Sequence, residues 1–151
     1  MKENIIIENK KVLHDYDILE KYEAGIVLIG HEVKSVKNGN IKLKSAFVTF
    51  YKGEPFLTNA HITKYKGAGS ILDYDPDRSR KLLLKKREIK RILGKSSEKG
   101  LTIVPISVYT KGSKIKVEIA VAHGKKQYEK KEKIKKKDLD REVMRTLKSN
   151  K

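Results

Sequence analysis

The feature that most restricts the fold of this chain is a pair of apolar runs on either side of a short polar link. Residues 101–110 form the first run and residues 114–122 the second, with Lys111-Gly112-Ser113 between them. In the second run apolar side chains occupy every other position, which places them on one face of a strand. A short link that contains glycine joins antiparallel strands. The sequence therefore predicts a hairpin with one buried face.

A second hairpin is predicted earlier in the chain. Ala46–Tyr51 and Glu54–Thr58 flank Lys52-Gly53, a dipeptide that is typical of a tight turn. Leu13–Leu28 is apolar and β-branched in its second half, which predicts an extended, half-buried segment. Gly25 within this segment predicts a bend or a bulge where a barrel turns.

Two further segments have helical spacing. Gly30–Gly39 suits one or two turns that Gly39 caps, with Val33, Val36 and Lys37 on one side. In residues 75–94 an apolar stripe predicts a helix that is ended by Gly94, with Asp77 near its N-cap. The stripe consists of Leu82, Ile89, Ile92 and Leu93.

Strands in hairpins with helices between them favour a small barrel, and the OB-fold is the barrel that most often binds RNA. By this analogy we expect a mainly β fold, an OB-like antiparallel β-barrel with about three peripheral helices. Its domain should span residues 1–123, because the composition changes at Gly124.

Residues 124–151 form a basic tail with twelve Lys and Arg against five Asp and Glu. Leu139, Val143 and Leu147 recur at intervals of four, a stripe too narrow to bury much surface by itself. We expect the tail to be disordered when free and to become helical against a partner. The alternative is a flexible tail that only improves solubility.

The net charge of +17 favours a polyanionic partner, because each basic group that meets a phosphate releases counterions. The alternative, a merely soluble basic surface, predicts more nearly balanced Lys and Glu than the 36 basic and 19 acidic residues present. The chain has no cysteine, which excludes disulfides and thiolate metal sites. No apolar run approaches the length of a membrane span, so we expect a cytoplasmic protein that does not contact a membrane.

The motifs of the sequence argue against catalysis. Asp73–Asp77 has the spacing at which a calcium loop begins, but Arg78 and Leu84 occupy positions that need Gly and Glu. The four histidines are scattered, and most carboxylates are interleaved with lysine, which disfavours the clustered acids of a metal-dependent nuclease. We therefore expect no catalytic residue, no metal and no cofactor.

The basic segments indicate recognition of RNA by shape and backbone, because there are only seven Tyr and three Phe for stacking. On the predicted strand, His14 and Tyr16 share one face and could stack on unpaired bases or pack on the barrel wall. Both interpretations stay open. The segments that could contact phosphates are Asn9-Lys10-Lys11, Arg78–Lys81, Lys85-Lys86-Arg87 and Lys125-Lys126.

Several segments, taken in order from Asn9 to the C-terminus, resemble the SsrA-binding protein family, also called small protein B. Each segment is weak alone, and the ordered set is specific. The segments are Asn9-Lys10-Lys11, His14-Asp15-Tyr16, Tyr22–Ile26, Gly30 with Glu32–Ser35, Arg80–Leu84, Gly100-Leu101-Thr102 and Gly124-Lys125-Lys126.

The resemblance implies a role in trans-translation, the rescue of stalled ribosomes. It implies a monomer with an OB-like barrel that binds the tRNA-like domain of transfer-messenger RNA. Elongation factor Tu and alanyl-tRNA synthetase would be indirect partners, since they act on the same RNA. The tail would occupy the decoding region of 16S rRNA and the empty message channel.

Carried over by position, the resemblance also implies two sets of site residues. Carboxylates in the first set can orient an Arg or Lys, or accept hydrogen bonds from base amino groups and 2′-hydroxyls. The RNA-facing set of the body is Asn9, Lys10, Lys11, His14, Tyr16, Glu23, Glu32, Lys34, Arg78, Arg80, Lys81, Leu83 and Leu84. The ribosome-facing set is Gly124, Lys125, Lys126, Tyr128, Lys130, Lys131, Lys135, Lys136, Lys137, Arg141 and Arg145.

One departure from the family pattern falls in the tail. Glu129-Lys130-Lys131 stands where the family commonly has Asp-Lys-Arg, so a forked guanidinium is replaced by a point charge. Two rival hypotheses remain for the whole chain: a general ribosomal or initiation-type OB protein with no preferred small RNA, and a nuclease.

Overall fold

The computed structural model describes residues 4–68, 73–98 and 100–124. Within them, nine strands and three α-helices follow one another, with a short 3-10 helix η1 (Lys66–Ala68) between β6 and β7. The helices are α1 (Lys10–Asp15), α2 (Gly30–Lys37) and α3 (Lys86–Ser96). The strands are β1 (Asn4–Glu8), β2 (Asp17–Ile26), β3 (Ile41–Lys42), β4 (Phe47–Tyr51), β5 (Glu54–Thr58), β6 (His61–Ile62), β7 (Arg80–Leu83), β8 (Leu101–Lys111) and β9 (Lys114–His123).

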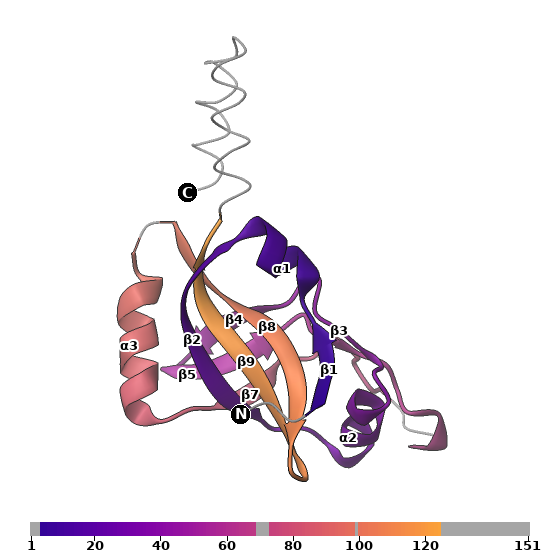
Figure 1. Ribbon diagram of the computed structural model, residues 1–151. Helices are drawn as coiled ribbons and strands as arrows, with labels where there is room; N and C mark the ends of the chain where they lie inside the picture. The colour runs from indigo at the N-terminus through magenta and orange to yellow at the C-terminus, as the bar shows by residue number, and fades with distance from the viewer. Residues whose placement is uncertain (1–3, 69–72, 99, 125–151) are drawn as a thin grey trace.

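Seven of the strands form one antiparallel sheet in the order β1-β8-β9-β2-β7-β5-β4, while β3 pairs with β6 in a small separate sheet. The strand β4 also lies against β8, so the sheet curls until its two ends approach each other. Figure 1 shows the long strands β2, β8 and β9 wrapping around this curl, with α1, α2 and α3 on its outside. The predicted mainly β, OB-like barrel with three peripheral helices is confirmed.

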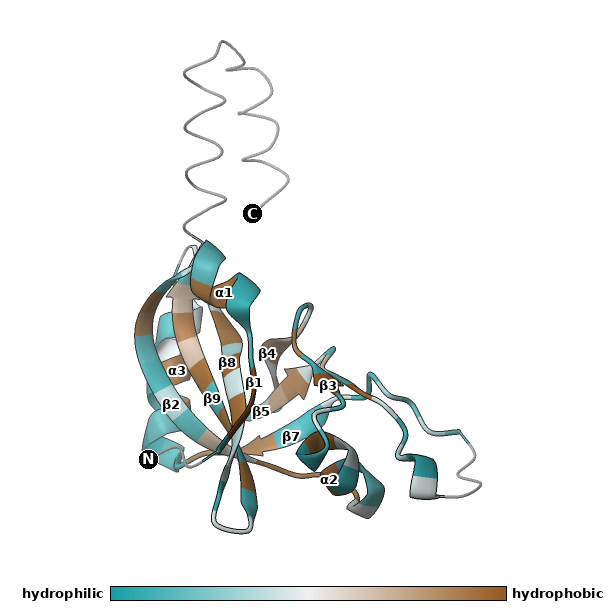
Figure 2. Cartoon of the chain, turned by 45° about the vertical axis from the view of Figure 1, so that its right-hand side comes forward, coloured by the Kyte–Doolittle hydropathy of each residue, from teal (hydrophilic) through white to brown (hydrophobic). Residues whose placement is uncertain are grey.

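The core fills the inside of the curled sheet. β9 contributes fully buried Val117, Ile119 and Val121, the alternate positions that the period of two predicts. Leu57 of β5 and Ile92 of α3 are buried in the same cluster. Full burial of such a side chain stabilises the fold by roughly 1.5–3 kcal/mol. Figure 2 shows the hydrophobic bands of β8 and β9 that belong to this core.

Both predicted hairpins are confirmed. β4 and β5 pair from Phe47–Thr58 to Tyr51–Glu54, and the turn residues Lys52 and Gly53 have φ of 51° and 79°. Positive φ at both central residues is the signature of the turn whose twist matches two antiparallel strands. β8 extends through Lys111, so the second connection is shorter than predicted.

The extended segment predicted from residue 13 is wrong at its start. The chain forms α1 first, and β2 begins only at Asp17. In the pairing of β2 with β9 the register shifts between Ile18 and Glu20, not at Gly25. Gly25 serves a different purpose, because a Cβ there would lie 3.3 Å from the Cβ of Leu83 on the paired strand β7.

The predicted helix in residues 75–94 is also wrong in its first half. Residues 80–83 form β7, which pairs with β5 and β2, and α3 starts at Lys86 and runs past Gly94 to Ser96. Leu82 faces the core from a strand, whereas Ile92 does so from the helix. Asp77 lies in a turn, where its N–H donates to Oδ1 of Asp75.

The predicted helix at Gly30 is confirmed as α2, and Gly39 follows it with a φ of +82°. Its buried face differs from the predicted one, because Lys37 is exposed while Glu32 and Ser35 are buried beside Val36. Gly124 is the last described residue at the C-terminal end, so the tail 125–151 and the predictions made for it lie outside the described residues.

Candidate RNA interface

Asn9 is one of the residues that the resemblance assigned to RNA, and the residue is 4% exposed. Its Oδ1 accepts a hydrogen bond from the N–H of Val12 (3.3 Å) at the start of α1. Its Nδ2 donates to the carbonyl oxygens of Leu43 (3.1 Å) and Pro105 (3.2 Å). The prediction that Asn9 faces RNA is wrong, because these bonds use the amide within the protein. Asn9 instead fixes α1 to β8 and to the segment before β4.

The helix α1 presents three of the predicted residues to solvent. Lys10, Lys11 and His14 are exposed, and Nδ1 of His14 lies 3.0 Å from Oδ1 of Asp15. Tyr16 follows the helix in an extended conformation and is half-buried. His14 and Tyr16 therefore do not share the face of one strand, which corrects the predicted geometry.

Tyr16 packs against a small apolar cluster that is separate from the barrel core. The cluster consists of Val12 of α1, Val104 of β8 and Ala122 of β9. This packing agrees with the interpretation that Tyr16 lies on the barrel wall. The ring also borders a groove beside α1, so the contact with the wall leaves part of the side chain accessible.

Glu23 lies on the outer face of β2, and donors from β8 hold its carboxylate. The Tyr109 hydroxyl donates to Oε2 at 2.5 Å, and Nζ of Lys111 lies 3.2 Å from Oε1. The Tyr109 hydrogen bond is the main cause that lowers the pKa of Glu23, against the effect of burial. Burial, and then the same carboxylate, raise the pKa of Tyr109. Glu23 is thus an ionised acceptor at neutral pH, with about a third of its side chain exposed.

Glu32 and Arg80 form the centre of a buried ionic cluster, so the prediction that they face RNA is wrong. Both side chains are fully buried. Arg80 donates to Oε2 of Glu32 through Nε (3.0 Å) and Nη2 (2.5 Å), and through Nη1 to the carbonyl of Ala60 (2.6 Å). Arg78 donates to the same carboxylate through Nε (3.1 Å) and Nη2 (2.5 Å). The carboxylate orients two arginines, which is one of the roles that the sequence allowed.

Tyr74 and the backbone complete this cluster. The Tyr74 hydroxyl lies 2.9 Å from both Oε2 of Glu32 and the carbonyl of Ile62, and its single proton can go to either. The N–H of Ile29 donates to Oε1 of Glu32 at 3.0 Å. Burial alone would raise the pKa of Glu32, but hydrogen bonds from Arg78, Ile29, Arg80 and Tyr74 outweigh it and lower the pKa to about 2. Burial and the carboxylate raise the pKa of Tyr74 to about 12.

Most of the remaining predicted residues lie at the surface, in different places. The Lys34 ammonium stands 5.5 Å from the centre of the Tyr65 ring. Nζ of Lys81 lies 3.1 Å from Oε2 of Glu54 in an exposed ion pair. Leu83 is 52% exposed, whereas Leu84 is half-buried and packs against the core.

Glu23 and Leu83 belong to one surface. Gly25 pairs with Leu83 on one side and with Lys116 on the other, and a hollow of about 330 Å³ borders all three. Glu23 lies two residues before Gly25, on the same face of β2, because side chains alternate along a strand. We name Glu23, Gly25, Leu83 and Lys116 the β2–β7 surface. It offers a carboxylate, an exposed apolar side chain and a cation together.

A second accessible region is the groove beside α1, of about 330 Å³. Lys11 and Tyr16 line it from the α1 side, as the sequence allowed, but Lys44, Phe47 and Thr102 line it as well. Thr102 belongs to a segment that carries the family resemblance, but no sequence pattern places it, Lys44 or Phe47 beside α1, because their segments meet only in the folded barrel. Tyr109 was missed for the same reason.

Two further findings concern metal sites and membrane-spanning helices among the described residues. In 4–68, 73–98 and 100–124, no three His, Asp or Glu side chains gather where they could hold a metal ion. In the same ranges, none of the helices has the length and apolar character needed to cross a membrane.

Comparison with known proteins places these features in a family. The family model described as SmpB protein matches residues 6–149. An SsrA-binding protein of Sulfurihydrogenibium sp. is 54% identical over 98% of this chain and 97% of its own length. One from Enterococcus faecalis is 48% identical over 97% of this chain and 94% of its own length.

A solved structure agrees with the sequence comparisons. It is described as "tmRNA-SmpB: a journey to the center of the bacterial ribosome", and it superposes with a TM-score of 0.65 at 46% identity, covering 78% of this chain and 82% of that one. A match of this extent and identity cannot come from a shared barrel architecture alone, because unrelated OB-like proteins share the fold without the sequence. The chain belongs to the SmpB protein family.

Proposed function

We propose that this protein binds the tRNA-like domain of transfer-messenger RNA and delivers it to stalled ribosomes for trans-translation, with no enzymatic activity of its own. The observation that carries the proposal is the family match over residues 6–149, with full-length relatives named SsrA-binding protein. The matching solved structure is described as a tmRNA–SmpB assembly in the bacterial ribosome. The net charge of +17 suits both RNA partners.

The β2–β7 surface is the part of the body that we assign to transfer-messenger RNA. The Glu23 carboxylate is ionised and keeps exposed lone pairs, so it can accept hydrogen bonds from 2′-hydroxyls or base amino groups. Exposed Leu83 can pack on a base or a sugar, and Lys116 can neutralise a phosphate. A surface that combines these groups reads the shape of a folded RNA more than its sequence.

The helix α1 supplies a second set of contacts in this proposal. Lys10 and Lys11 are exposed cations, and the exposed His14 ring can stack on an unpaired base. The residues that follow Gly124 are assigned to the decoding region of 16S rRNA and to the empty message channel. Their excess of twelve basic over five acidic residues suits that partner. Lys130 and Lys131 would contact phosphates there as point charges.

The cellular setting follows from the same proposal. A protein that works on the ribosome works in the cytoplasm, as a monomer on one RNA. Elongation factor Tu and alanyl-tRNA synthetase would be indirect partners through the RNA that they share with this chain.

The test measures affinity for the isolated tRNA-like domain at physiological salt, with bulk tRNA as competitor. We expect bulk tRNA at a large excess to leave the complex in place, since a merely electrostatic complex would be competed away. Competition on equal terms would support the general ribosomal hypothesis instead. A chain truncated after His123 should keep this binding and lose rescue of stalled ribosomes, and loss of both would contradict the division between body and tail.

The nuclease hypothesis has its own test. End-labelled RNA incubated with the purified full-length protein and Mg²⁺ should stay intact, because no carboxylate cluster gathers within the described ranges. Cleavage that persists through purification, and that follows the protein peak, would favour the nuclease.

A further inference from the structure

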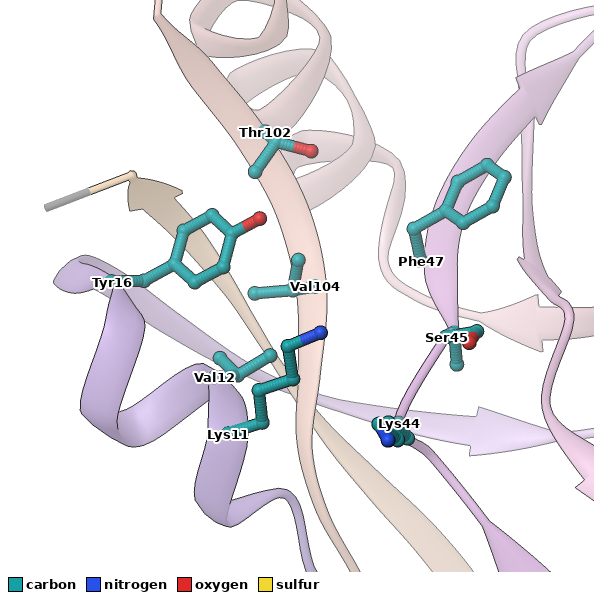
Figure 3. Close-up of a pocket in the computed structure, with 9 residues that line it drawn as sticks. Lys11, Val12, Tyr16, Lys44, Ser45, Phe47, Thr102 and Val104 are labelled. Carbon is teal, nitrogen blue, oxygen red and sulfur yellow. The ribbon is translucent and has the colours of Figure 1, made fainter. Parts of the chain in front are cut away.

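The groove beside α1 is built from three parts of the chain. We name it the α1 groove and define it by Lys11, Tyr16, Lys44, Phe47 and Thr102. Figure 3 shows Tyr16 and Phe47 on opposite sides, with Thr102 and Val104 of β8 between them. Its volume of about 330 Å³ lies at the lower end of the range for ligand sites, which is roughly 300–1,000 Å³. The groove shares no lining residue with the β2–β7 surface.

Two aromatic rings border the α1 groove. Tyr16 reaches it from the end of α1, and Phe47 from the first residue of β4. Phe47 is 37% exposed, which leaves part of a large apolar ring in contact with water. Aromatic rings at a surface are the usual platforms for unpaired bases, since every base offers a π-face. The aromatic lining therefore favours a flat, partly apolar ligand.

The charge of the lining selects an anion. Lys11 and Lys44 are exposed at the groove, and none of the described residues that line it is an Asp or a Glu. Ser45 and Thr102 add hydroxyls that can donate or accept hydrogen bonds. Figure 3 shows the Lys11 amino group directed over the floor of the groove, not away from it. Cations beside aromatic rings and hydroxyls match a phosphate joined to a base and a sugar.

The spacing of the groove is held by Asn9. Its amide donates to the carbonyl of Leu43, the residue before Lys44, and to that of Pro105, the residue after Val104. Its Oδ1 accepts from Val12, the residue after Lys11. One buried side chain thus ties α1, the floor and the opposite side together, so the site is preformed. A preformed site loses less conformational entropy on binding.

From these observations we infer that the α1 groove binds one unpaired ribonucleotide, with the base between Tyr16 and Phe47 and the flanking phosphates on Lys11 and Lys44. The inference rests on the proposed function in taking RNA as the partner, and it adds a site that the family match does not assign. A paired base would not enter, because a duplex keeps its π-faces stacked inside. The groove would therefore distinguish RNA with a bulged or looped-out nucleotide from a continuous helix.

The test uses the full-length protein and two hairpin RNAs with the same stem and loop. One hairpin carries a single bulged 2-aminopurine, and the other is fully paired. At physiological salt we expect the bulged hairpin to bind about tenfold more tightly, within the range that stacking of one base on aromatic side chains supplies. The 2-aminopurine fluorescence should change on binding, because the base leaves its own stack.

Substitutions then locate the effect. Phe47→Leu keeps apolar volume and removes the π-face, and it should reduce the preference for the bulge to less than about twofold. Tyr51→Leu is the matched control, since Tyr51 lies on the same strand, is 64% exposed and does not line the groove. It should leave the preference unchanged. Lys44→Gln should weaken binding of both hairpins and lower the salt slope by about one.

Several outcomes would overturn the inference. The first is equal affinity for the two hairpins. The second is a preference for the bulged hairpin that survives Phe47→Leu, or that Tyr51→Leu removes to the same extent. The third is displacement of the bulged hairpin by a glutamate-rich peptide of equal charge. The last outcome would assign the groove to an acidic protein segment. Competition by bulk tRNA against the tRNA-like domain is measured separately on the unmodified chain. If bulk tRNA displaces the tRNA-like domain but the bulged hairpin is still preferred, the proposed function is contradicted and the groove inference stands. If the tRNA-like domain resists bulk tRNA but the bulged hairpin is not preferred, only the groove inference is contradicted.

Discussion

The Arg80 guanidinium donates to the Glu32 carboxylate through Nε at 3.0 Å and Nη2 at 2.5 Å, and neither side chain has any exposed surface. The family resemblance implied that both residues face RNA. The structure uses them to hold α2 against the start of β7. Breaking a buried pair from one side leaves the other charge unpaired, which costs more than the pair itself contributes.

Replacement of Glu32 by Gln tests this pair. We expect Glu32→Gln to lower the free energy of unfolding by roughly 3–5 kcal/mol, because two guanidinium groups lose their carboxylate, one of them in a fully buried position. Urea denaturation followed by circular dichroism measures the change. Glu54→Gln breaks the exposed pair with Lys81 and should cost at most about 1 kcal/mol. Equal losses of unfolding free energy in the two variants would show that the buried carboxylate stabilises the fold no more than the exposed one does.

The same carboxylate predicts how stability depends on pH. The folded-state pKa of Glu32 is lowered to about 2 from its ordinary value of 4.5, so the folded state holds the ionised form more strongly than the unfolded chain does. This contribution is complete above pH 4.5 and is lost as the pH falls toward 2. Urea midpoints measured between pH 6 and pH 2.5 should fall less steeply in Glu32→Gln than in the unmodified protein. If the urea midpoints of the two proteins fell equally with pH, the lowered pKa would not belong to Glu32.

Tyr109 sets the ionisation of Glu23 on the β2–β7 surface. Tyr109→Phe removes the hydrogen bond that is the main cause of the lowered pKa of Glu23, so that pKa should rise toward its ordinary value. A carboxyl-carbon NMR titration of Glu23 measures the shift. The cost in stability should be about 1 kcal/mol, since the carboxylate can turn to water. The titration of Glu32 provides the internal control and should not move.

Neighbouring leucines on β7 separate RNA binding from folding. Leu83 is 52% exposed, so Leu83→Ala should change the unfolding free energy by no more than about 0.5 kcal/mol while it weakens binding of the tRNA-like domain. Leu82 is 1% exposed and lies in the core, so Leu82→Ala should cost about 2–5 kcal/mol. Filter binding and urea denaturation on both variants check the pair. Unchanged RNA affinity in Leu83→Ala would remove this residue from the interface.

The elements that the sequence predicted well are those with a strong local pattern. The two hairpins needed only alternation and a glycine turn, and α2 needed only a short amphipathic run with Gly39 beyond it. The errors arose where tertiary contacts decide. The short helix α1 exists because Asn9 caps it and binds two distant carbonyls, which no local pattern reveals.

The stripe from Leu82 to Leu93 shows the same limit in another form. Leu82 falls at helical spacing from Ile89, yet it faces the core from a strand that two neighbours pair with. Some of the predicted site residues are neighbours in the sequence but differ in exposure in the structure. Arg80 and Leu83 are three residues apart, and one is fully buried while the other is half exposed. Burial of a charge depends on partners such as Glu32, which is 48 residues away from Arg80 in the chain.

The pairing of β8 with β9 has a consequence for whatever the C-terminal residues do. Thr102, which lines the α1 groove, stands opposite Ala122, and Leu101 stands opposite His123. The position of Gly124, the residue after β9, is therefore set by the same ladder that sets the floor of the groove. A deletion of one residue in β9 would turn the later side chains of this strand to the opposite face and shift Gly124 by one residue's rise, about 3.4 Å. The pairing of β8 with β9 thus fixes the point from which the last 27 residues begin, relative to any ligand in the groove.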